Sequence, residues 1–354
     1  MKRKYNVLDL FCGAGGLSLG FKLAGYNIVG GIDFQGDAIK THEKNFKNSK
    51  SICGDIKEIT DEQVKKLFEN KVDVIIGGPP CQGFSAGNRQ QIENDPRNKL
   101  FFEFIRFVKI LKPKAIVIEN VRQILTKDKG FAKNKIFEIL EEQGYNVDVR
   151  VLTASDYGVP QNRNRAVFIG IKKEIGTVNY DKIKKEKKIV TIKEAIGELY
   201  SLENCNDRLL KNVPKTKFQK YVRSKDNTII NHDIRYPNEN VQERMKHVPQ
   251  GGNWRDVPKE LWKVQRENRH SSAYKRLNEN EPSITIDTGH MNYFHPIYNR
   301  VPTVRESARI QSFPDDFEFV GTPTSQLRQV GNAVPPLMAK AVAELIKEAL
   351  DNEN

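Results

Sequence analysis

A cysteine in a stiff loop is the residue of this sequence that most directly indicates chemistry. Cys81 follows Gly77-Gly78-Pro79-Pro80, in which two glycines end a short apolar run and two prolines restrict the turn. A structural cysteine is normally buried, whereas a reactive thiol needs partial exposure and a positive environment. We therefore interpret Cys81 as a nucleophile; the alternative is a small buried residue at a turn.

A carboxyl group and two arginines stand near other predicted strand ends. Glu119 follows the apolar run 115–118. When a thiolate attacks C6 of a pyrimidine, electrons move onto the ring, and a carboxylic acid that gives a proton to N3 relieves that charge. Arg163 and Arg165, two residues apart before a strand, can bind a carboxylate, a phosphate or a base carbonyl. A basic pair on the surface is the alternative for the arginines.

A glycine-rich turn and two acidic residues indicate a nucleotide-like cofactor. The turn lies in residues 9–16, between the first predicted strand and helix, where glycines let a ligand approach the backbone N–H groups. Asp33 and Asp55 follow at strand ends, where a carboxylate can accept hydrogen bonds from ribose hydroxyl groups. Either aspartate alone could be a solvated turn residue, but the combination predicts an adenosine-bearing cofactor.

The elements that must position these residues alternate over the first 170 residues. Apolar runs of strand length occur at 5–11, 28–32, 72–76, 115–118, 147–153 and 166–171, and helical patterns occur at 17–24, 37–46, 100–111 and 132–143. Such alternation predicts an α/β fold, with a parallel sheet covered by helices on both faces. In such sheets ligands bind beyond the carboxyl ends of the strands, where the residues named above stand.

After residue 171 the alternation stops and the positive charge rises. Gly251-Gly252, Trp254, Trp262 and several prolines predict a second, loop-rich domain, followed by a last helix at 335–350. The net charge of the chain is +13, and residues 171–226 hold 15 Lys and Arg against 8 Asp and Glu, a net of 15 − 8 = +7. This excess favours a polyanionic partner, although a solvated lysine-rich surface is the alternative.

The composition argues against several other classes of protein. None of the four cysteines has C-x-x-C spacing, so we expect no metal site, redox motif or disulfide framework. The mean hydropathy is -0.60, and no apolar run approaches the roughly 20 residues that cross a bilayer. Asp9 interrupts the first apolar run, which argues against a signal peptide. We expect a cytoplasmic protein without membrane contact.

Six motifs, taken in order, resemble those of the cytosine-C5 DNA methyltransferases, the modification enzymes of bacterial restriction-modification systems. The resemblance extends over nearly the whole chain. It rests on Phe11-x-Gly13-x-Gly15, Pro80-Cys81-Gln82, Glu119-Asn120-Val121, Gln161-x-Arg163-x-Arg165, the segment 300–314 and the segment 329–336.

The resemblance implies a Rossmann-like methyltransferase domain at 1–175 plus 325–354, and a smaller, loop-rich target-recognition domain at 176–324. It implies S-adenosyl-L-methionine as methyl donor, double-stranded DNA as substrate and a monomeric protein. A cognate restriction endonuclease that acts independently is the further partner that it implies. It does not indicate which DNA sequence is recognised.

The resemblance also implies roles for individual residues. Cys81 would attack C6 of a cytosine flipped out of the duplex, and Glu119 would protonate or hydrogen-bond N3. Arg165 would contact the cytosine carbonyl, and Arg163 would help to hold the site. The expected cofactor-lining residues are Phe11, Gly13, Gly15, Asp33, Asp55, Ile56, Pro80, Leu100, Asn332 and Val334. Residues 85–99 would form a loop that closes over DNA, and the candidates for DNA contacts are Arg255, Arg266, Arg269 and His270.

One position departs from the family pattern. The family usually has Glu at the position of Asp33, often with Asp two residues later, where this chain has Gln35.

Two alternative functions stay open. An enzyme of the same fold that methylates cytosine in transfer RNA is one alternative, but its animal and plant version has a Cys-Phe-Thr tripeptide that this chain lacks. A non-catalytic DNA-binding regulator is the other, and it would be expected to have lost the catalytic residues first.

Overall fold

A computed structural model of the chain describes residues 4–80, 98–205, 208–262, 273–287 and 293–352. The chain forms two compact units. The first comprises Met1–Tyr157, Asn164–Lys185 and Val334–Asn354, and the second comprises Gly158–Arg163 and Glu186–Ala333. The main boundaries between the two units fall after residues 185 and 333, whereas the domain boundaries implied by the family resemblance are near residues 175 and 325. The assignment of a catalytic and a target-recognition domain stays a prediction.

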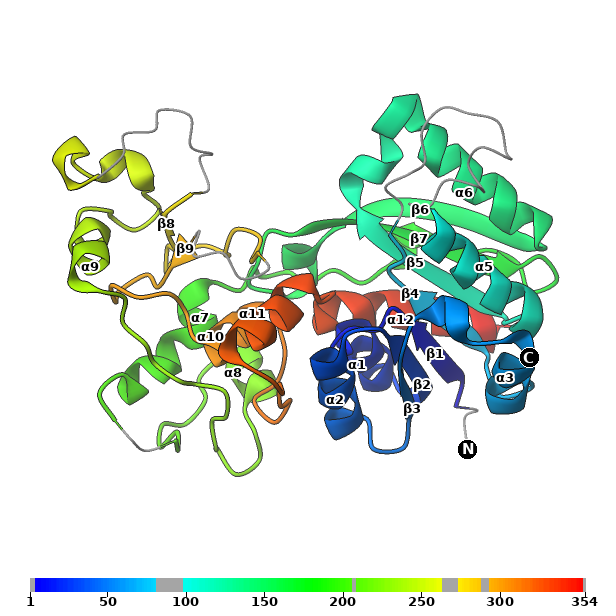
Figure 1. Ribbon diagram of the computed structural model, residues 1–354, viewed down its shortest axis with the longest axis horizontal. Coiled ribbons are helices and arrows are strands. Elements are labelled where there is room, and N and C mark those ends of the chain that lie inside the picture. Colours follow the sequence, from blue (N-terminus) through cyan, green and yellow to red (C-terminus); the bar gives the residue numbers. More distant parts are fainter. Residues whose placement is uncertain (1–3, 81–97, 206–207, 263–272, 288–292, 353–354) are drawn as a thin grey trace. The chain divides into compact units, whose positions relative to one another are not determined.

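A seven-stranded sheet forms the centre of the first unit (Figure 1). Its order is β3-β2-β1-β4-β5-β7-β6. The strands are β1 (Asn6–Leu10), β2 (Asn27–Asp33), β3 (Lys50–Cys53), β4 (Val74–Gly77), β5 (Ala115–Val121), β6 (Tyr145–Thr153) and β7 (Asn164–Lys172). The predicted α/β fold is confirmed.

One strand departs from the predicted parallel sheet. Strands β1 to β5 pair in parallel, whereas β7 runs antiparallel to both β5 and β6. Only residues 154–163 connect β6 to β7. That connection is shorter than the crossover of a dozen or more residues that parallel neighbours need, so the two strands form an antiparallel pair.

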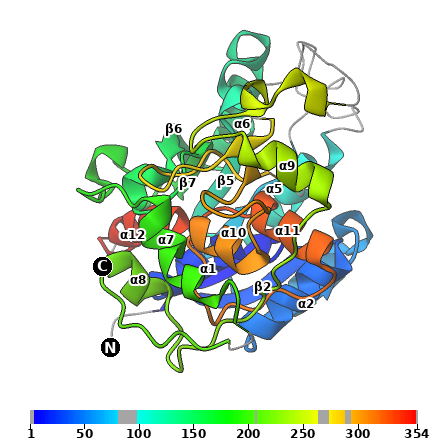
Figure 2. The same ribbon diagram turned by 90° about the vertical axis from the view of Figure 1, so that its left-hand side faces the viewer.

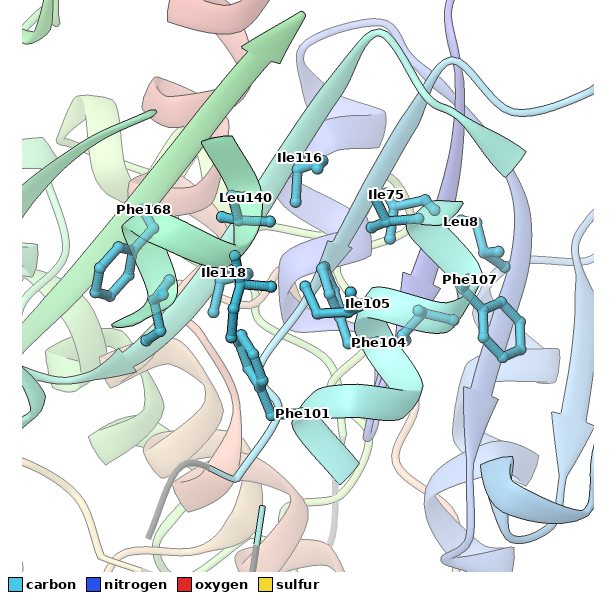
Figure 3. Close-up of a cluster of buried hydrophobic side chains, with 14 of the residues drawn as sticks. Leu8, Ile75, Phe101, Phe104, Ile105, Phe107, Ile116, Ile118, Leu140 and Phe168 are labelled. Carbon is cyan, nitrogen blue, oxygen red and sulfur yellow. The ribbon is translucent and has the colours of Figure 1, made fainter. Parts of the chain in front are cut away.

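Helices cover both faces of this sheet, because its strands carry apolar side chains on both sides. The helices are α1 (Gly16–Leu23), α2 (Gly36–Asn45), α3 (Asp61–Phe68), α5 (Lys99–Leu111), α6 (Phe131–Glu142) and α12 (Pro336–Asp351). In α5 the buried residues Phe101, Phe104 and Phe107 recur at helical spacing. They pack against Leu8, Ile75, Ile116 and Ile118 from three adjacent strands (Figure 3). Helix α1 packs against α12.

The second unit contains short helices and a small sheet. The helices are α7 (Ile192–Ile196), α8 (Lys217–Val222), α9 (Glu239–Lys246), α10 (Val304–Ile310) and α11 (Pro323–Asn332), and a parallel two-stranded sheet joins β8 (Lys275–Arg276) to β9 (Tyr293–Phe294). Helix α10 contacts both α7 and α11 (Figure 2). A reciprocal capping pair, Thr303 with Glu306, begins α10.

Buried ion pairs, rather than apolar packing alone, hold α10 in the second unit. The Arg300 guanidinium donates to Glu203 and to Glu306, with nitrogen–oxygen distances of 2.5 to 2.9 Å. Arg309 donates in the same way to both carboxylate oxygens of Asp315. All of these side chains are buried. Removal of one member would leave an uncompensated charge in the interior, which is strongly destabilising.

Candidate active site

The carboxyl ends of β4 and β5 lie side by side at one edge of the first unit's sheet. Gly77 ends β4 and pairs with Ile118 of β5, so the Gly78–Pro80 turn and Glu119 follow neighbouring strands. The Asn120 side-chain amide donates to the Pro79 carbonyl at 3.1 Å and so joins the two strand ends. Cys81, the predicted nucleophile, directly follows this turn but lies outside the described residues, which stop at residue 80.

Glu119 and Arg165 form an ion pair at this edge. Arg165 Nε lies 2.6 Å from Glu119 Oε1, and the two side chains are only 15% and 14% exposed. The pairing of β5 with β7 explains the contact: Val121 is opposite Arg165 and Glu119 is opposite Val167, so Glu119 and Arg165 are diagonal neighbours on one face. Arg165 Nη1 also donates to the Asn164 carbonyl at 2.9 Å, so the backbone of β7 helps to hold the guanidinium beside Glu119.

Gly78 lies directly beside the Glu119 carboxylate. A Cβ added at Gly78 would lie 3.2 Å from Glu119 Oε2, closer than an ordinary van der Waals contact. The glycine therefore lets the carboxylate lie against the backbone of the turn that leads to Cys81.

Arg163 has a different environment from Arg165. It belongs to the second unit, where its buried guanidinium donates to the carbonyls of Ile286 at 3.3 Å and Gly331 at 3.0 Å. Its neighbour Gln161 is also buried and donates to Gln311 Oε1 at 3.0 Å. These contacts are those of a residue that ties backbone segments together, and a catalytic role for Arg163 stays a prediction.

The glycine turn has left-handed backbone at three positions. Strand β1 ends at Leu10, and Phe11, Gly13 and Gly15 all have positive φ angles of 62°, 52° and 96°. Left-handed backbone is costly for most residues but not for glycine. The Gly15 N–H donates to the Cys12 carbonyl at 2.9 Å, which closes the turn immediately before α1.

A cavity of about 350 Å³ opens beside this turn and gathers five of the ten predicted cofactor-lining residues. These five are Phe11, Asp33, Asp55, Ile56 and Leu100, and the remaining wall comes from Ile32, Phe34, Gly54, Lys57 and Lys99. The cavity has apolar walls and two carboxylates. An aromatic base with an attached ribose needs that combination.

Backbone N–H groups hold the Asp33 carboxylate at the end of β2. Gly13 N–H donates to Oδ2 and Gln35 N–H donates to Oδ1, each at 2.9 Å. Burial raises the pKa of Asp33 above its ordinary value, although these hydrogen bonds oppose the shift. Gly13 therefore contributes through Asp33, and each carboxylate oxygen keeps a lone pair for a ligand hydroxyl group.

Asp55, in the cavity wall, caps the turn helix Ile56–Glu58, and the hydrogen bond that its carboxylate accepts from the Lys57 side chain lowers the Asp55 pKa. The other predicted cofactor residues lie at several places. Gly15 begins α1 and Pro80 is an exposed turn residue. Asn332 ends α11 in the second unit, and Val334 precedes α12 in the first. Cofactor contacts by these residues stay predictions.

Phe34 is a cavity residue that the sequence analysis did not single out. Its side chain is 68% exposed although it is a large aromatic group, and it lines the cavity directly after Asp33. An exposed aromatic next to a strand-end carboxylate is a signal that the sequence does contain. We would expect such a ring to be covered by a ligand.

The predicted DNA contacts are only partly described. Arg255 is exposed and its guanidinium lies 4.7 Å from the Trp254 ring centroid. Arg266, Arg269, His270 and residues 85–97 of the predicted mobile loop lie outside the described residues. In the basic stretch 171–226, ion pairs within the described part of the chain involve at least seven of the 15 Lys and Arg residues.

The described residues contain no group of three or more His, Cys, Asp or Glu side chains that could hold a metal ion. They also contain no helix that is both long enough and apolar enough to span a bilayer.

Comparisons with known proteins agree over almost the full chain. The sequence model of the C-5 cytosine-specific DNA methylases matches residues 5–348. The Type II methyltransferase M1.HphI of Haemophilus parahaemolyticus is 37% identical over 98% of this chain and 87% of its own length. The Type II methyltransferase M.DdeI of Desulfomicrobium norvegicum is 38% identical over 99% of this chain and 90% of its own length.

A solved structure agrees with the fold as well. A DNA modification methyltransferase encoded within an Escherichia coli prophage is 32% identical, with a TM-score of 0.81 over 98% of this chain and 100% of that one. The glycine turn, the strand-end carboxylates and the similarity of both sequence and fold lead to one conclusion: the chain belongs to the C-5 cytosine-specific DNA methylase family.

Proposed function

We propose that this protein methylates C5 of one cytosine in a specific duplex DNA sequence, through a covalent bond between Cys81 and C6 of that cytosine. The observation that carries the proposal is the ion pair between Glu119 on β5 and Arg165 on β7. Strand β5 pairs with β4, whose carboxyl end leads to Cys81. Nucleophile, acid and anion-binding group would then meet at one strand edge, as attack on a pyrimidine ring requires.

The residues of the cavity in the first unit fit S-adenosyl-L-methionine. Phe11, Phe34 and Ile56 offer apolar surface to an adenine ring, and Asp33 offers carboxylate oxygens to the ribose. The cofactor supplies the methyl group that C5 of cytosine takes up. We assign this cavity to its adenosine part.

The chain's own groups account for the other steps. The Cys81 thiolate adds to C6 of a cytosine flipped out of the duplex, and the electron pair displaced toward N3 takes a proton from Glu119, which acts in its protonated form at this step. Arg165 contacts Glu119 through Nε and the Asn164 carbonyl through Nη1, and its Nη2 would donate to the cytosine carbonyl. After C5 is methylated, water takes the C5 proton, the thiolate departs from C6 and N3 returns its proton to Glu119, which restores the aromatic ring.

The names of the relatives support a proposal for the biological role. M1.HphI and M.DdeI are named as Type II methyltransferases, so we propose that this enzyme modifies cytoplasmic DNA and protects it from a cognate restriction endonuclease that acts separately. We expect it to work as a monomer. The second unit would read the target sequence, and its basic residues would contact phosphates, so DNA affinity should fall steeply as salt rises.

A methyl-transfer assay with two substrates tests the proposal. We expect transfer of a labelled methyl group from S-adenosyl-L-methionine to duplex DNA and none to transfer RNA, and bisulfite sequencing of the product would identify the recognised site. The Cys81→Ser variant should bind DNA and cofactor but transfer no methyl group. Activity on RNA alone, or full activity of the variant, would refute the proposal.

A further inference from the structure

The N-terminus of α1 is closed by a side chain from a strand. The N-cap position is Gly15, which has no side chain to accept a hydrogen bond from the first turn. Instead, Asp9 of β1 reaches α1: Oδ2 accepts the Ser18 backbone N–H at 3.2 Å and the Ser18 hydroxyl at 2.6 Å. Asp9 is only 1% exposed. A buried carboxylate therefore holds the first turn of α1, which directly follows the glycine turn.

A histidine ring continues this contact to the other side of the turn. Ser18 Oγ lies 3.4 Å from His42 Nε2, and His42 Nδ1 lies 2.7 Å from Ser51 Oγ on β3. The ring lies against two glycines, since a Cβ at Gly31 would be 2.6 Å from His42 Nε2 and one at Gly15 would be 3.0 Å from His42 Cδ2. His42 thus occupies the space that side chains at Gly15 and Gly31 would need.

The hydrogen bonds that connect Asp9, Ser18, His42 and Ser51 can all be made with the donors and acceptors in either of two arrangements. With Asp9 ionised, the Ser18 hydroxyl donates to Asp9 and accepts from His42 Nε2–H, so Nδ1 accepts from Ser51. With Asp9 protonated, Asp9 donates to Ser18, Ser18 donates to His42 Nε2, and the proton of the neutral ring is on Nδ1. Each direction leaves every member with a partner.

We propose that Asp9, Ser18 and His42 are positioning residues for the cofactor cavity, and that their hydrogen-bonded chain reverses direction when Asp9 gains a proton. The hydrogen-bonded residues Asp9, Ser18 and His42 act on the cavity through the glycine turn. That turn carries Phe11 and supplies the Gly13 N–H that holds Asp33. The inference rests on the proposed use of this cavity for S-adenosyl-L-methionine.

The surroundings of Asp9 indicate that the reversal occurs near neutral pH. Burial and, to a smaller extent, the Asp33 carboxylate raise the pKa of Asp9 to about 7, although the two hydrogen bonds from Ser18 oppose this shift. Burial lowers the pKa of His42 to about 4, so the ring changes tautomer rather than charge. Burial also raises the pKa of the Cys12 thiol, so Cys12 stays neutral beside them.

Nitrogen NMR of the imidazole rings tests the reversal directly. In protein labelled at its six histidines, the signals of His42, assigned by their loss in His42→Gln, should change from the Nδ1–H to the Nε2–H pattern as pH rises, with a midpoint near 7. Asp9→Asn should abolish this change at an unaltered fold, judged by circular dichroism. A single His42 tautomer from pH 5 to 9 in the wild type would overturn the reversal.

Cofactor affinity tests the positioning role. We expect Asp9→Asn and Ser18→Ala to weaken binding of S-adenosyl-L-methionine by about tenfold at pH 8, the loss typical of a hydrogen bond to a charged group. The wild-type affinity should fall as pH drops below about 7, when Asp9 gains its proton, and Asp9→Asn should lose that dependence. His247→Gln, at an exposed histidine of the second unit, serves as the control and should bind normally.

The outcomes separate this inference from the proposed function. If the wild-type protein neither binds the cofactor nor methylates DNA, the proposed function fails. If the wild type binds the cofactor, but folded Asp9→Asn and Ser18→Ala bind equally well with the wild-type pH dependence, the positioning role fails alone.

Discussion

Gly78 offers a direct test of whether the exact position of the Glu119 carboxylate controls the rate of methyl transfer. In Gly78→Ala the new Cβ would lie 3.2 Å from Glu119 Oε2, whereas ordinary contacts begin at 3.4 Å, so the carboxylate must move by a few tenths of an ångström. The backbone itself accepts alanine, because Gly78 is not among the glycines with positive φ. The substitution thus perturbs the carboxylate with little effect on the fold.

The size of the effect follows from the displacement. A misplacement of about 1 Å at a reacting group can cost about 100-fold in rate, so a few tenths of an ångström scales to roughly a fivefold fall in kcat. The cofactor KM and the melting temperature should stay close to the wild-type values. The assay is single-turnover transfer of a labelled methyl group to duplex DNA at saturating cofactor.

The adjacent glycine provides a matched control. A Cβ at Gly77 would collide with the Leu10 backbone carbonyl, which cannot move aside as a side chain can, so Gly77→Ala should lower stability markedly. In a Glu119→Gln background, Gly78→Ala should have no further effect on the rate, since the two changes act through the same group. Wild-type kcat in Gly78→Ala, or a slowing of equal size in the Glu119→Gln background, would refute the reasoning.

Three further predictions concern other parts of the molecule. Asp33→Asn should weaken cofactor binding roughly tenfold or more, because it removes a carboxylate held toward the cavity, and calorimetric titration would measure the change. Arg165→Leu should lower the rate more than Arg165→Lys, since only lysine keeps a charge beside Glu119; equal rates in a single-turnover assay would contradict this. Glu306 should make the protein sensitive to acid. Burial alone would raise the pKa of Glu306, but hydrogen bonds from Arg300 lower it to about 2. The ionised Glu306 therefore stabilises the fold by about 3 kcal/mol above its ordinary pKa of 4.5, and this contribution is lost as the pH falls toward 2. Glu306→Gln should remove this part of the pH dependence of the unfolding free energy and destabilise the protein at neutral pH; an acid transition unchanged by the substitution would count against the assignment.

Much of the first unit could be predicted from local sequence patterns. Helices α5 and α6 have clear apolar periodicity, and their predicted bounds lie within one residue of the observed ones. Strand β3 and helix α3 were missed. The strand has only four partly exposed residues, and the helix buries only Val64 and Phe68, although the Thr60–Gln63 capping pair marks its start.

The site could be predicted where chemistry and strand ends coincide. Five of the expected cofactor residues line one cavity because strand-end loops of a parallel sheet meet at the same edge. The surroundings of Arg163 could not be predicted in this way, because its partners Ile286 and Gly331 lie more than 120 residues further along the chain. The Asp9–Ser18–His42 chain was also missed, since its spacing forms no local pattern.

Covalent trapping of DNA tests the central claim, that Cys81 attacks C6 of the target cytosine. The enzyme would be incubated with S-adenosyl-L-methionine and a duplex that carries 5-fluorocytosine at the methylated position, where fluorine cannot leave as a proton does. We predict a stable protein–DNA adduct that maps by mass spectrometry to the peptide containing Cys81 and is absent in Cys81→Ser. An enzyme that methylates normal DNA but gives no adduct, or one attached at another residue, would contradict the account.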